Sequence, residues 1–209
     1  VAILPAVLLS DGPCVIENLP DISDVSTILR TMQSLGAQIR MINRSTVEID
    51  PRHVNSFVVS KKMAEGMRAS SYFLGALLGR MLSARVAPPG GCDFGVRPID
   101  QHIKGFEALG AKMTIENGMV DAKAMSLTGC LIYLDVVSVG ATINIMLAAA
   151  KADGLTIIEN AAREPHIVDL ANFLNSMGAN IMGAGTGVIK IRGVKHLSGA
   201  DYSIIPDQI

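Results

Sequence analysis

The sequence predicts an α/β domain with pseudo-threefold symmetry, built from three repeated units. Two observations support this class. A short ending recurs along the chain, as SLGAQI at 34–39, ALGAKM at 108–113 and SMGANI at 176–181. An amphipathic stretch with helical spacing precedes each ending, and strand-forming sequence follows it. Each unit is therefore expected to contain a helix, a strand, a second helix and two further strands.

Each unit begins with an apolar helix, and those of the second and third units are expected to lie in the interior. The three stretches are VAILPAVLLSDG, ASSYFLGALLGRMLSA and GATINIMLAAAKADG. Those at 70–84 and 140–151 are apolar on almost every face, which is typical of helices surrounded by sheets. The chain is expected to form one domain, with units of about 1–60, 61–134 and 135–209.

The second helix of each unit is expected to end at a glycine in the left-handed conformation, at Gly36, Gly110 and Gly178. The position eighteen residues before each glycine is expected to be equivalent in the three units and to lie at the end of the preceding strand. The count reaches Asn18 in the first unit, Asn160 in the third and Cys92 in the middle one. We therefore expect Cys92 to occupy a position that the repeat otherwise fills with asparagine.

Composition and charge argue against several classes of protein. With 209 residues, of which 49% are hydrophobic and 18% charged, the chain has the makeup of a packed globular protein. A net charge of −1, scattered basic residues and few aromatic residues argue against a nucleic-acid partner. No apolar run approaches the roughly 18 residues of a membrane span. Because the chain opens at Val1 within a helical pattern, we expect it to be a piece of a longer protein.

The cysteines indicate a reducing compartment. The chain has three cysteines, Cys14, Cys92 and Cys130, which is an odd number. They form no CxxC pair, and no histidine lies at zinc-ligand spacing from them. Neither a disulfide framework nor a metal site is expected, and no cofactor is implied.

The segment APPGGCDFGVRPIDQH, residues 87–102, gathers reactive groups where proline and glycine disfavour a helix. Cys92 follows two glycines, which permit unusual backbone geometry, and Arg97 is near enough in sequence to favour a thiolate. We interpret Cys92 as a functional thiol. The alternative, a small buried core residue, is our interpretation of Cys14 and Cys130.

Other residues near the helix starts have two interpretations. Asp100 suits a helix cap or first turn, and His102 in that turn could equally be a solvated surface residue. Together with Arg97, however, the free amides of a helix start would form an anion site. Arg68 is either a surface arginine or a second cation at the same cleft. SVGATIN, starting with Ser138, resembles a phosphate-binding helix start, although the pattern is weak alone.

These segments resemble the UDP-N-acetylglucosamine 1-carboxyvinyltransferase family, the enolpyruvyl transferases of peptidoglycan synthesis. The resemblance covers essentially the whole chain through PPGGCDFGVRPIDQHIKGFEALGAKM, MRAS, SVGAT and IENAAREPHIVDLANFL. It implies an inside-out α/β barrel of three helix-strand-helix-strand-strand units, as one domain of a two-domain enzyme. The second domain is expected to be encoded largely downstream.

The resemblance also implies a reaction. Members transfer the enolpyruvyl group of phosphoenolpyruvate to the 3′-hydroxyl of UDP-N-acetylglucosamine and release phosphate, by addition to a tetrahedral ketal and then elimination. This is the first committed step of peptidoglycan synthesis. It implies a cytoplasmic location and roles in cell-wall biogenesis, cell shape and cell division. The expected partners are the two substrates and the second domain, with no nucleic acid and no membrane.

Site roles follow from the resemblance position by position. Cys92 matches the loop cysteine that acts as general acid, forms a phosphoenolpyruvate adduct and is alkylated by fosfomycin. Arg97 and Arg68 match arginines at the anionic reactant and the cleft, and Tyr72 stands where some members have tryptophan. The segment expected to hold the uridine is Pro98, Ile99, Asp100, Gln101 and His102. The segment expected to contact the diphosphate is Ser138, Val139 and Gly140.

The chain departs from the family pattern in several places. Val136 replaces a lysine that some members have near the diphosphate. An active-site lysine would fall before Val1, and the aspartate and arginine of the second domain are absent, so the isolated chain is expected not to turn over. Alternatives are the shikimate-pathway enolpyruvyl transferases, a non-catalytic paralogue that binds UDP-sugar, and a structural repeat domain with an incidental cysteine.

Overall fold

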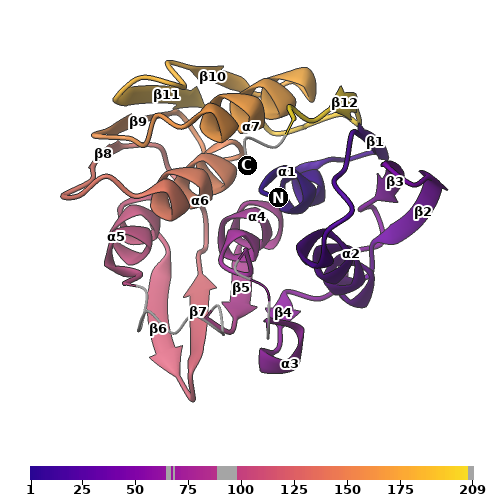
Figure 1. Cartoon of the computed structure of the whole chain (residues 1–209). Coiled ribbons are helices and arrows are strands. Elements are labelled where there is room, and N and C mark those ends of the chain that lie inside the picture. The colour runs from indigo at the N-terminus through magenta and orange to yellow at the C-terminus, as the bar shows by residue number, and fades with distance from the viewer. Residues whose placement is uncertain (65–66, 68, 89–97, 207–209) are drawn as a thin grey trace.

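The computed structural model describes residues 1–64, 67, 69–88 and 98–206, so Arg68, Cys92 and Arg97 lie outside the described residues. Within these ranges, three four-stranded sheets surround a group of buried helices (Figure 1). The arrangement confirms the predicted α/β class with interior helices. No helix in the described ranges is long and apolar enough to cross a bilayer.

The three sheets share one topology. The first runs β12 (Asp201–Ser203), β1 (Cys14–Glu17), β3 (Thr46–Asp50), β2 (Gln38–Asn43). The second runs β4 (Val58–Val59), β5 (Ser83–Val86), β7 (Met119–Lys123), β6 (Lys112–Glu116). The third runs β8 (Leu131–Tyr133), β9 (Leu155–Glu159), β11 (Val188–Arg192), β10 (Asn180–Met182). In each, the first pair is parallel and the other two pairs are antiparallel.

The parallel edge strand of each sheet was not predicted from the sequence. β4 and β8 each precede the inner helix of the following repeat, yet they pair with the strand that comes after that helix. β12 pairs with β1, so that Val15 lies opposite Asp201. This last pairing joins the two ends of the chain and closes the sheets into a ring. Strands of two or three residues are too short to show alternating hydrophobicity, which explains why they were missed.

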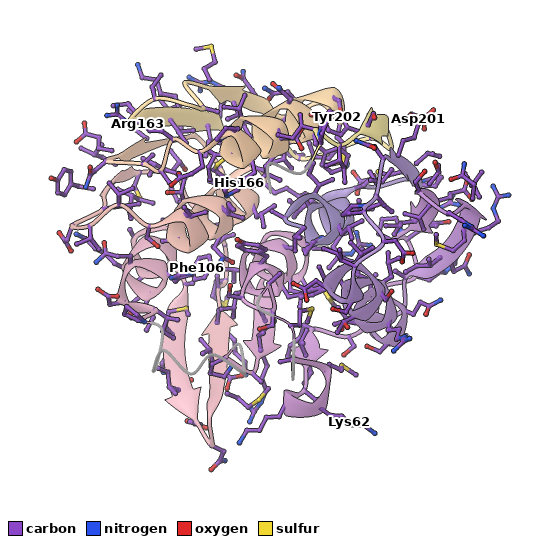
Figure 2. The ribbon with its side chains drawn as sticks, in the orientation of Figure 1. Lys62, Phe106, Arg163, His166, Asp201 and Tyr202 are labelled. Carbon is purple, nitrogen blue, oxygen red and sulfur yellow. The ribbon has the colours of Figure 1, made fainter. Side chains whose placement is uncertain are left out.

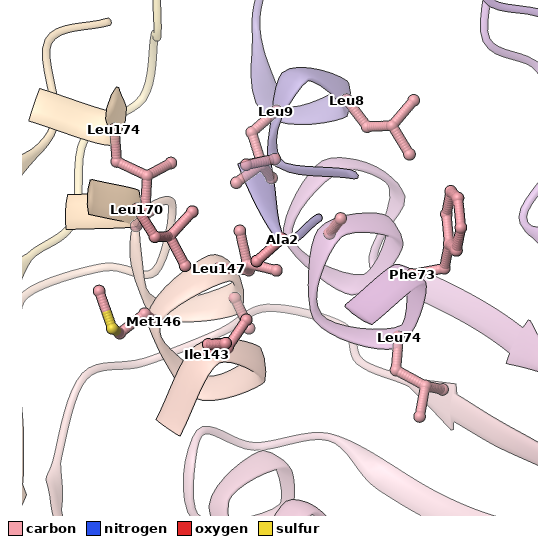
Figure 3. Close-up of a cluster of buried hydrophobic side chains, with 14 of the residues drawn as sticks. Ala2, Leu8, Leu9, Phe73, Leu74, Ile143, Met146, Leu147, Leu170 and Leu174 are labelled. Carbon is pink, nitrogen blue, oxygen red and sulfur yellow. The ribbon is translucent and has the colours of Figure 1, made fainter. Parts of the chain in front are cut away.

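The interior is formed by the predicted apolar helices. They are α1 (Ile3–Ala6) with the 3-10 helix η1 (Val7–Leu9), α4 (Tyr72–Met81) and α6 (Val139–Ala149). Every residue of α6 from 141 to 149 is buried, and so is α4 from 73 to 79. Figure 3 shows Leu9, Leu74 and Leu147 from these helices in one cluster that also includes Leu170.

The outer helices end as predicted. They are α2 (Ser23–Leu35), α5 (Asp100–Ala108) and α7 (Pro165–Ser176), and a short α3 (Lys61–Ala64) precedes α4. The predicted glycines have φ of 110°, 105° and 106°, in the left-handed region. After each glycine, an alanine N–H donates to the carbonyl five residues earlier, at distances of 3.0, 2.9 and 3.0 Å.

The sheet register corrects the expected place of Cys92. Asn18 lies four residues after Cys14, which pairs with Ile49 and through it with Ile39. Asn160 lies four residues after Thr156, which pairs with Ile191 and through it with Ile181. The matching residue of the middle sheet is Ala84, which faces Ala122 and through it Met113. Four residues after Ala84 is Pro88, not Cys92. The middle repeat therefore has four additional residues between this slot and its helix-ending glycine.

Candidate functional site

The structure brings together the two segments predicted to bind a nucleotide. Residues 100–102 form the first turn of α5, and residues 139–140 begin α6, with Ser138 as its N-cap. His102 Nε2 and Cε1 lie 3.0 and 3.3 Å from the position that a Cβ on Gly140 would occupy. The imidazole thus lies beside the first turn of α6, so closely that a side chain at position 140 would have to displace the ring.

His102 is a buried residue, and the alternative interpretation of it as a solvated surface histidine is wrong. Its exposed fraction is 7%. Burial lowers the pKa of the imidazole to about 4, only partly opposed by the carboxylate of Asp100. Nδ1 is buried and has no hydrogen-bond partner among the described residues. At neutral pH the ring is therefore uncharged and is held by packing.

Gln101 connects α5 to the loop before α6. Its side-chain Oε1 accepts the backbone N–H of Asp135 at 2.9 Å, and its Nε2 donates to Asp100 Oδ2 at 2.9 Å. That bond lowers the pKa of the Asp100 carboxyl. Lys104 Nζ donates to Asp135 Oδ1 at 2.8 Å and lowers the pKa of that carboxyl. Asp100 is the first residue of α5 and belongs to its first turn, and Pro98 and Ile99 precede it.

The start of α6 has the arrangement expected of an anion site. Ser138 Oγ accepts the N–H of Ala141 at 3.2 Å, and its carbonyl accepts the N–H of Thr142 at 3.0 Å. The N–H groups of Val139 and Gly140 have no acceptor among the described residues. Two backbone donors at the positive end of an 11-residue helix are therefore free for a ligand.

Tyr72 lies in a different place. It lines a cavity of about 570 Å³ together with His166, Asp169 and Asn18. Figure 2 shows His166 at the start of α7. None of residues 98–102 or 138–140 lines this cavity. The apolar part of its lining comes from Val1, Ala2, Ile3, Leu19, Pro20, Ile22, Val25, Ile204, Ile205 and Pro206.

Both places are on the side of the domain where the helices begin. Gly75 and Gly79 of α4 approach Asn144 and Ala148 of α6, so these helices run parallel. α5 runs parallel to α6 as well, because Gly105 meets Ile145 one turn beyond the contact of His102 with Gly140. The first turns of α2 and α7 line the cavity beside the start of α4. Several helix dipoles thus direct their positive ends to one face, which favours anionic ligands.

The described cysteines have the properties of structural residues. Burial raises the pKa of the Cys14 thiol, which is fully buried in β1 and lies 3.8 Å from Met177 Sδ. Burial also raises the pKa of Cys130, whose Sγ contacts the carbonyl oxygen of Ala108 at 3.2 Å. Neither thiol is activated as a nucleophile. In the described part of the chain, no group of three or more His, Cys, Asp or Glu could hold a metal ion.

The sequence reasoning missed His166 and Asn18 as residues of the cavity. Asn18 was identified only as a strand end, and His166 is part of a charged stretch that the resemblance already covered. The cavity forms where the two ends of the chain meet, and nothing local in the sequence indicated that meeting.

Comparison with known proteins gives consistent results. The family model described as EPSP synthase (3-phosphoshikimate 1-carboxyvinyltransferase) matches residues 1–209. A relative from Caldanaerobacter subterraneus subsp. tengcongensis, named UDP-N-acetylglucosamine 1-carboxyvinyltransferase 3, is 59% identical over 209 residues, which is all of this chain and 50% of the relative. The UDP-N-acetylglucosamine 1-carboxyvinyltransferase of Clostridium botulinum is 58% identical over 210 residues, with the same shares. The chain thus spans about half the length of the curated relatives it matches.

Solved structures agree on the fold. The enolpyruvyl transferase NikO from Streptomyces tendae superposes with a TM-score of 0.84 at 24% identity, over 99% of this chain and 49% of that one. EPSP synthase from Acinetobacter baumannii gives a TM-score of 0.74 at 17% identity, over 97% of this chain and 47% of that one. At these identities the likeness establishes the shared fold.

Proposed function

Because the chain belongs to the EPSP synthase family, we propose that it is one domain of an enolpyruvyl transferase that uses phosphoenolpyruvate and UDP-N-acetylglucosamine. The observation that carries the proposal is the 53–59% identity, over the whole chain, to proteins named UDP-N-acetylglucosamine 1-carboxyvinyltransferase. The identity to EPSP synthase structures is 17–18%, which disfavours a shikimate-pathway substrate.

The geometry of the described residues supports anionic substrates of this kind. Both proposed substrates carry phosphate groups, and the start of α6 presents the free backbone N–H groups of Val139 and Gly140. In this proposal Pro98, Ile99, Asp100, Gln101 and His102 hold the uridine, while Ser138, Val139 and Gly140 bind the diphosphate. The hydrogen bond from Asp135 to Gln101 and the contact between His102 and Gly140 bring these two segments side by side. Tyr72 would act from the adjacent cavity.

The chemistry requires an acid near the phosphoenolpyruvate. The sugar 3′-hydroxyl loses its proton to a base and its oxygen adds to C2 of the enol phosphate, as the methylene carbon C3 gains a proton from an acid, which produces a tetrahedral ketal. Phosphate then leaves C2, and C3 loses a proton to restore the double bond. We assign the proton donation to C3 to the Cys92 thiol, with Arg97 and Arg68 as cations for the anionic reactant.

The four additional residues of the middle repeat support this assignment. They fall between Pro88 and Gly110, in the same segment of sequence that contains Cys92, whereas the first and third repeats lack them. An insertion confined to one of three similar repeats is not needed to form the repeat itself. Such local additions commonly carry function.

The half-length match has a consequence for activity. We propose that the other half of the longer relatives supplies further groups to the reaction, so that this chain binds substrate weakly and does not turn over alone. Turnover would place the protein in peptidoglycan synthesis in the cytoplasm, with effects on cell-wall biogenesis, cell shape and division.

Intact-mass spectrometry after incubation with fosfomycin tests the proposal. The protein is treated with and without UDP-N-acetylglucosamine, and Cys92→Ser is the matched control. We expect one covalent adduct that maps to Cys92 and forms faster with the sugar nucleotide. Cys14 and Cys130 should stay unmodified, because the pKa of each is raised. No adduct, or one that persists in Cys92→Ser, would contradict the assignment and favour a non-catalytic paralogue.

A further inference from the structure

The contact between His102 and Gly140 is the closest described approach between the two segments proposed to bind the nucleotide. Nε2 and Cε1 of the His102 ring lie within 3.3 Å of the position that a Cβ on Gly140 would occupy. The ring is also almost fully enclosed, with an exposed fraction of 7%. An enclosed ring cannot move aside without opening the space between α5 and α6, so it fixes how far apart their first turns lie.

Hydrogen bonding does not account for a histidine at this position. Nδ1 is buried without a partner among the described residues, which normally destabilises a fold by about 1–3 kcal/mol. An apolar residue of similar size would avoid that cost. The structure therefore retains a polar ring that contributes through its shape and reach and not through an internal bond at Nδ1.

We propose that His102 is a positioning residue that sets the spacing between the first turn of α5 and the first turn of α6, so that a nucleoside diphosphate is bound by both segments at once. This inference rests on the proposed function and deepens it. The ligand class is a nucleoside diphosphate sugar, whose base and diphosphate are joined covalently. Two subsites help each other only when their spacing matches the ligand.

The proposal predicts a loss that depends on the ligand. When the spacing is no longer fixed, each segment still binds its own part of the ligand, but the linked ligand loses the advantage of binding both. Shortened side chains at 102 should therefore weaken UDP-N-acetylglucosamine binding by about tenfold. Binding of inorganic pyrophosphate alone should change by less than about twofold, because it touches only the segment at 138–140 and not the segment that contains His102.

Two variants of His102 test whether a side chain must extend as far as the place of Nε2 to support binding. His102→Asn keeps a polar atom near the place of Nδ1 but lacks the ring atoms that face Gly140. His102→Gln extends a polar atom toward the place of Nε2. We expect the glutamine variant to retain most of the affinity for UDP-N-acetylglucosamine and the asparagine variant to lose it.

A double substitution tests the contact itself. Gly140→Ala places a Cβ 3.0 Å from Nε2, so we expect it to displace the ring and to weaken UDP-N-acetylglucosamine binding. Adding His102→Asn to Gly140→Ala should cause little further loss, because the pair no longer meets. Gly105→Ala is the matched control. Its Cβ would press on the end of the Ile145 side chain, one turn farther from the helix starts, and should change stability more than affinity.

The measurement is ligand-observed NMR titration of the 209-residue chain, which detects weak binding, with the thermal unfolding midpoint of each variant recorded by circular dichroism. If the unaltered chain does not bind UDP-N-acetylglucosamine, the proposed function fails. If it binds, and His102→Asn loses affinity equally for pyrophosphate and the sugar nucleotide, or loses none, the positioning role of His102 is wrong. A loss confined to the sugar nucleotide, with His102→Gln as the rescue, supports it.

Discussion

Asn18 donates its side-chain amide to the carbonyl of Ile204, 186 residues later in the chain, at 2.8 Å. Asn160 makes the same bond to Leu134, also at 2.8 Å. Both asparagines follow a strand and have positive φ, 61° and 56°. Each acceptor directly follows the parallel edge strand of that sheet, β12 or β8. The same type of hydrogen bond thus holds the parallel edge strand in place in two of the three sheets.

Replacement of Asn160 separates the backbone effect from the hydrogen bond. Asn160→Ala should lower the free energy of unfolding by about 2 kcal/mol, because it loses the bond and puts alanine, which tolerates the left-handed region less readily than asparagine, at positive φ. Asn160→Gly should cost only about 1 kcal/mol, since glycine accepts this conformation. Urea denaturation measures both. Equal losses for the two variants would show that the backbone conformation contributes nothing.

Tyr202 connects β12 to α7 and should contribute more to stability than an exposed tyrosine. Its hydroxyl donates to Asp169 Oδ1 at 2.7 Å, and its ring lies 5.3 Å from that of Phe173. Tyr202→Phe keeps the ring contact, removes this bond and should lower the free energy of unfolding by about 2 kcal/mol. The control, Tyr133→Phe, alters an exposed ring and should change it by less than about 0.5 kcal/mol. Similar effects of the two variants in a chemical melt would contradict this.

Arg80 should contribute strongly to the free energy of unfolding, although it forms no ion pair among the described residues. Its guanidinium donates to the carbonyls of Leu8, Ser10 and Pro51 at 2.7, 3.0 and 2.8 Å. Arg80→Met leaves these carbonyls without their donor and should cost about 3 kcal/mol. Arg85→Met, which removes a partly exposed ion pair to Asp121 at 3.5 Å, should cost about 0.5 kcal/mol. The reverse order in calorimetry would be evidence against this role.

Gly75 is expected to be the least replaceable residue of α4. A Cβ there would collide with the backbone of Asn144, whose side chain already accepts the Gly75 N–H at 2.9 Å. Gly75→Ala should lower the free energy of unfolding by about 3 kcal/mol or more, because two packed helices must separate. At Gly12 a Cβ would meet its nearest atom at 3.4 Å, so Gly12→Ala should be nearly neutral. A stable, fully folded Gly75→Ala would show that the helices adjust easily.

His102 should make stability depend on pH. Its pKa in the folded chain is lowered to about 4 from an ordinary 6.5, so between these values the unfolded chain binds a proton that the folded chain does not. Stability contributed by the neutral ring is full above about pH 6.5 and falls as the pH drops toward 4, by about 3 kcal/mol in all. Urea denaturation of His102→Gln between pH 7 and pH 4.5 should show a correspondingly weaker dependence. An unchanged dependence would mean that His102 titrates normally.

Local patterns predicted much of this fold. Gly36, Gly110 and Gly178 were identified as helix ends because a left-handed residue after an amphipathic stretch is a local requirement. The inner helices were recognised because a helix that is apolar on every face has to be buried. The segments around Cys92 and Ser138 indicate the enolpyruvyl transferase family from sequence alone.

Other features depend on contacts between distant parts of the chain, and only the tertiary structure decided them. The edge strands are formed by partners 26 to 186 residues away, so a segment of two or three residues has no pattern of its own. The register placed Pro88, not Cys92, in the asparagine slot, because insertions before and after a strand cannot be located by counting along the sequence. The burial of His102 likewise comes from α6, which begins 37 residues after it. Local sequence determines the helices and the longer strands, whereas packing determines the edge strands and which side chains meet.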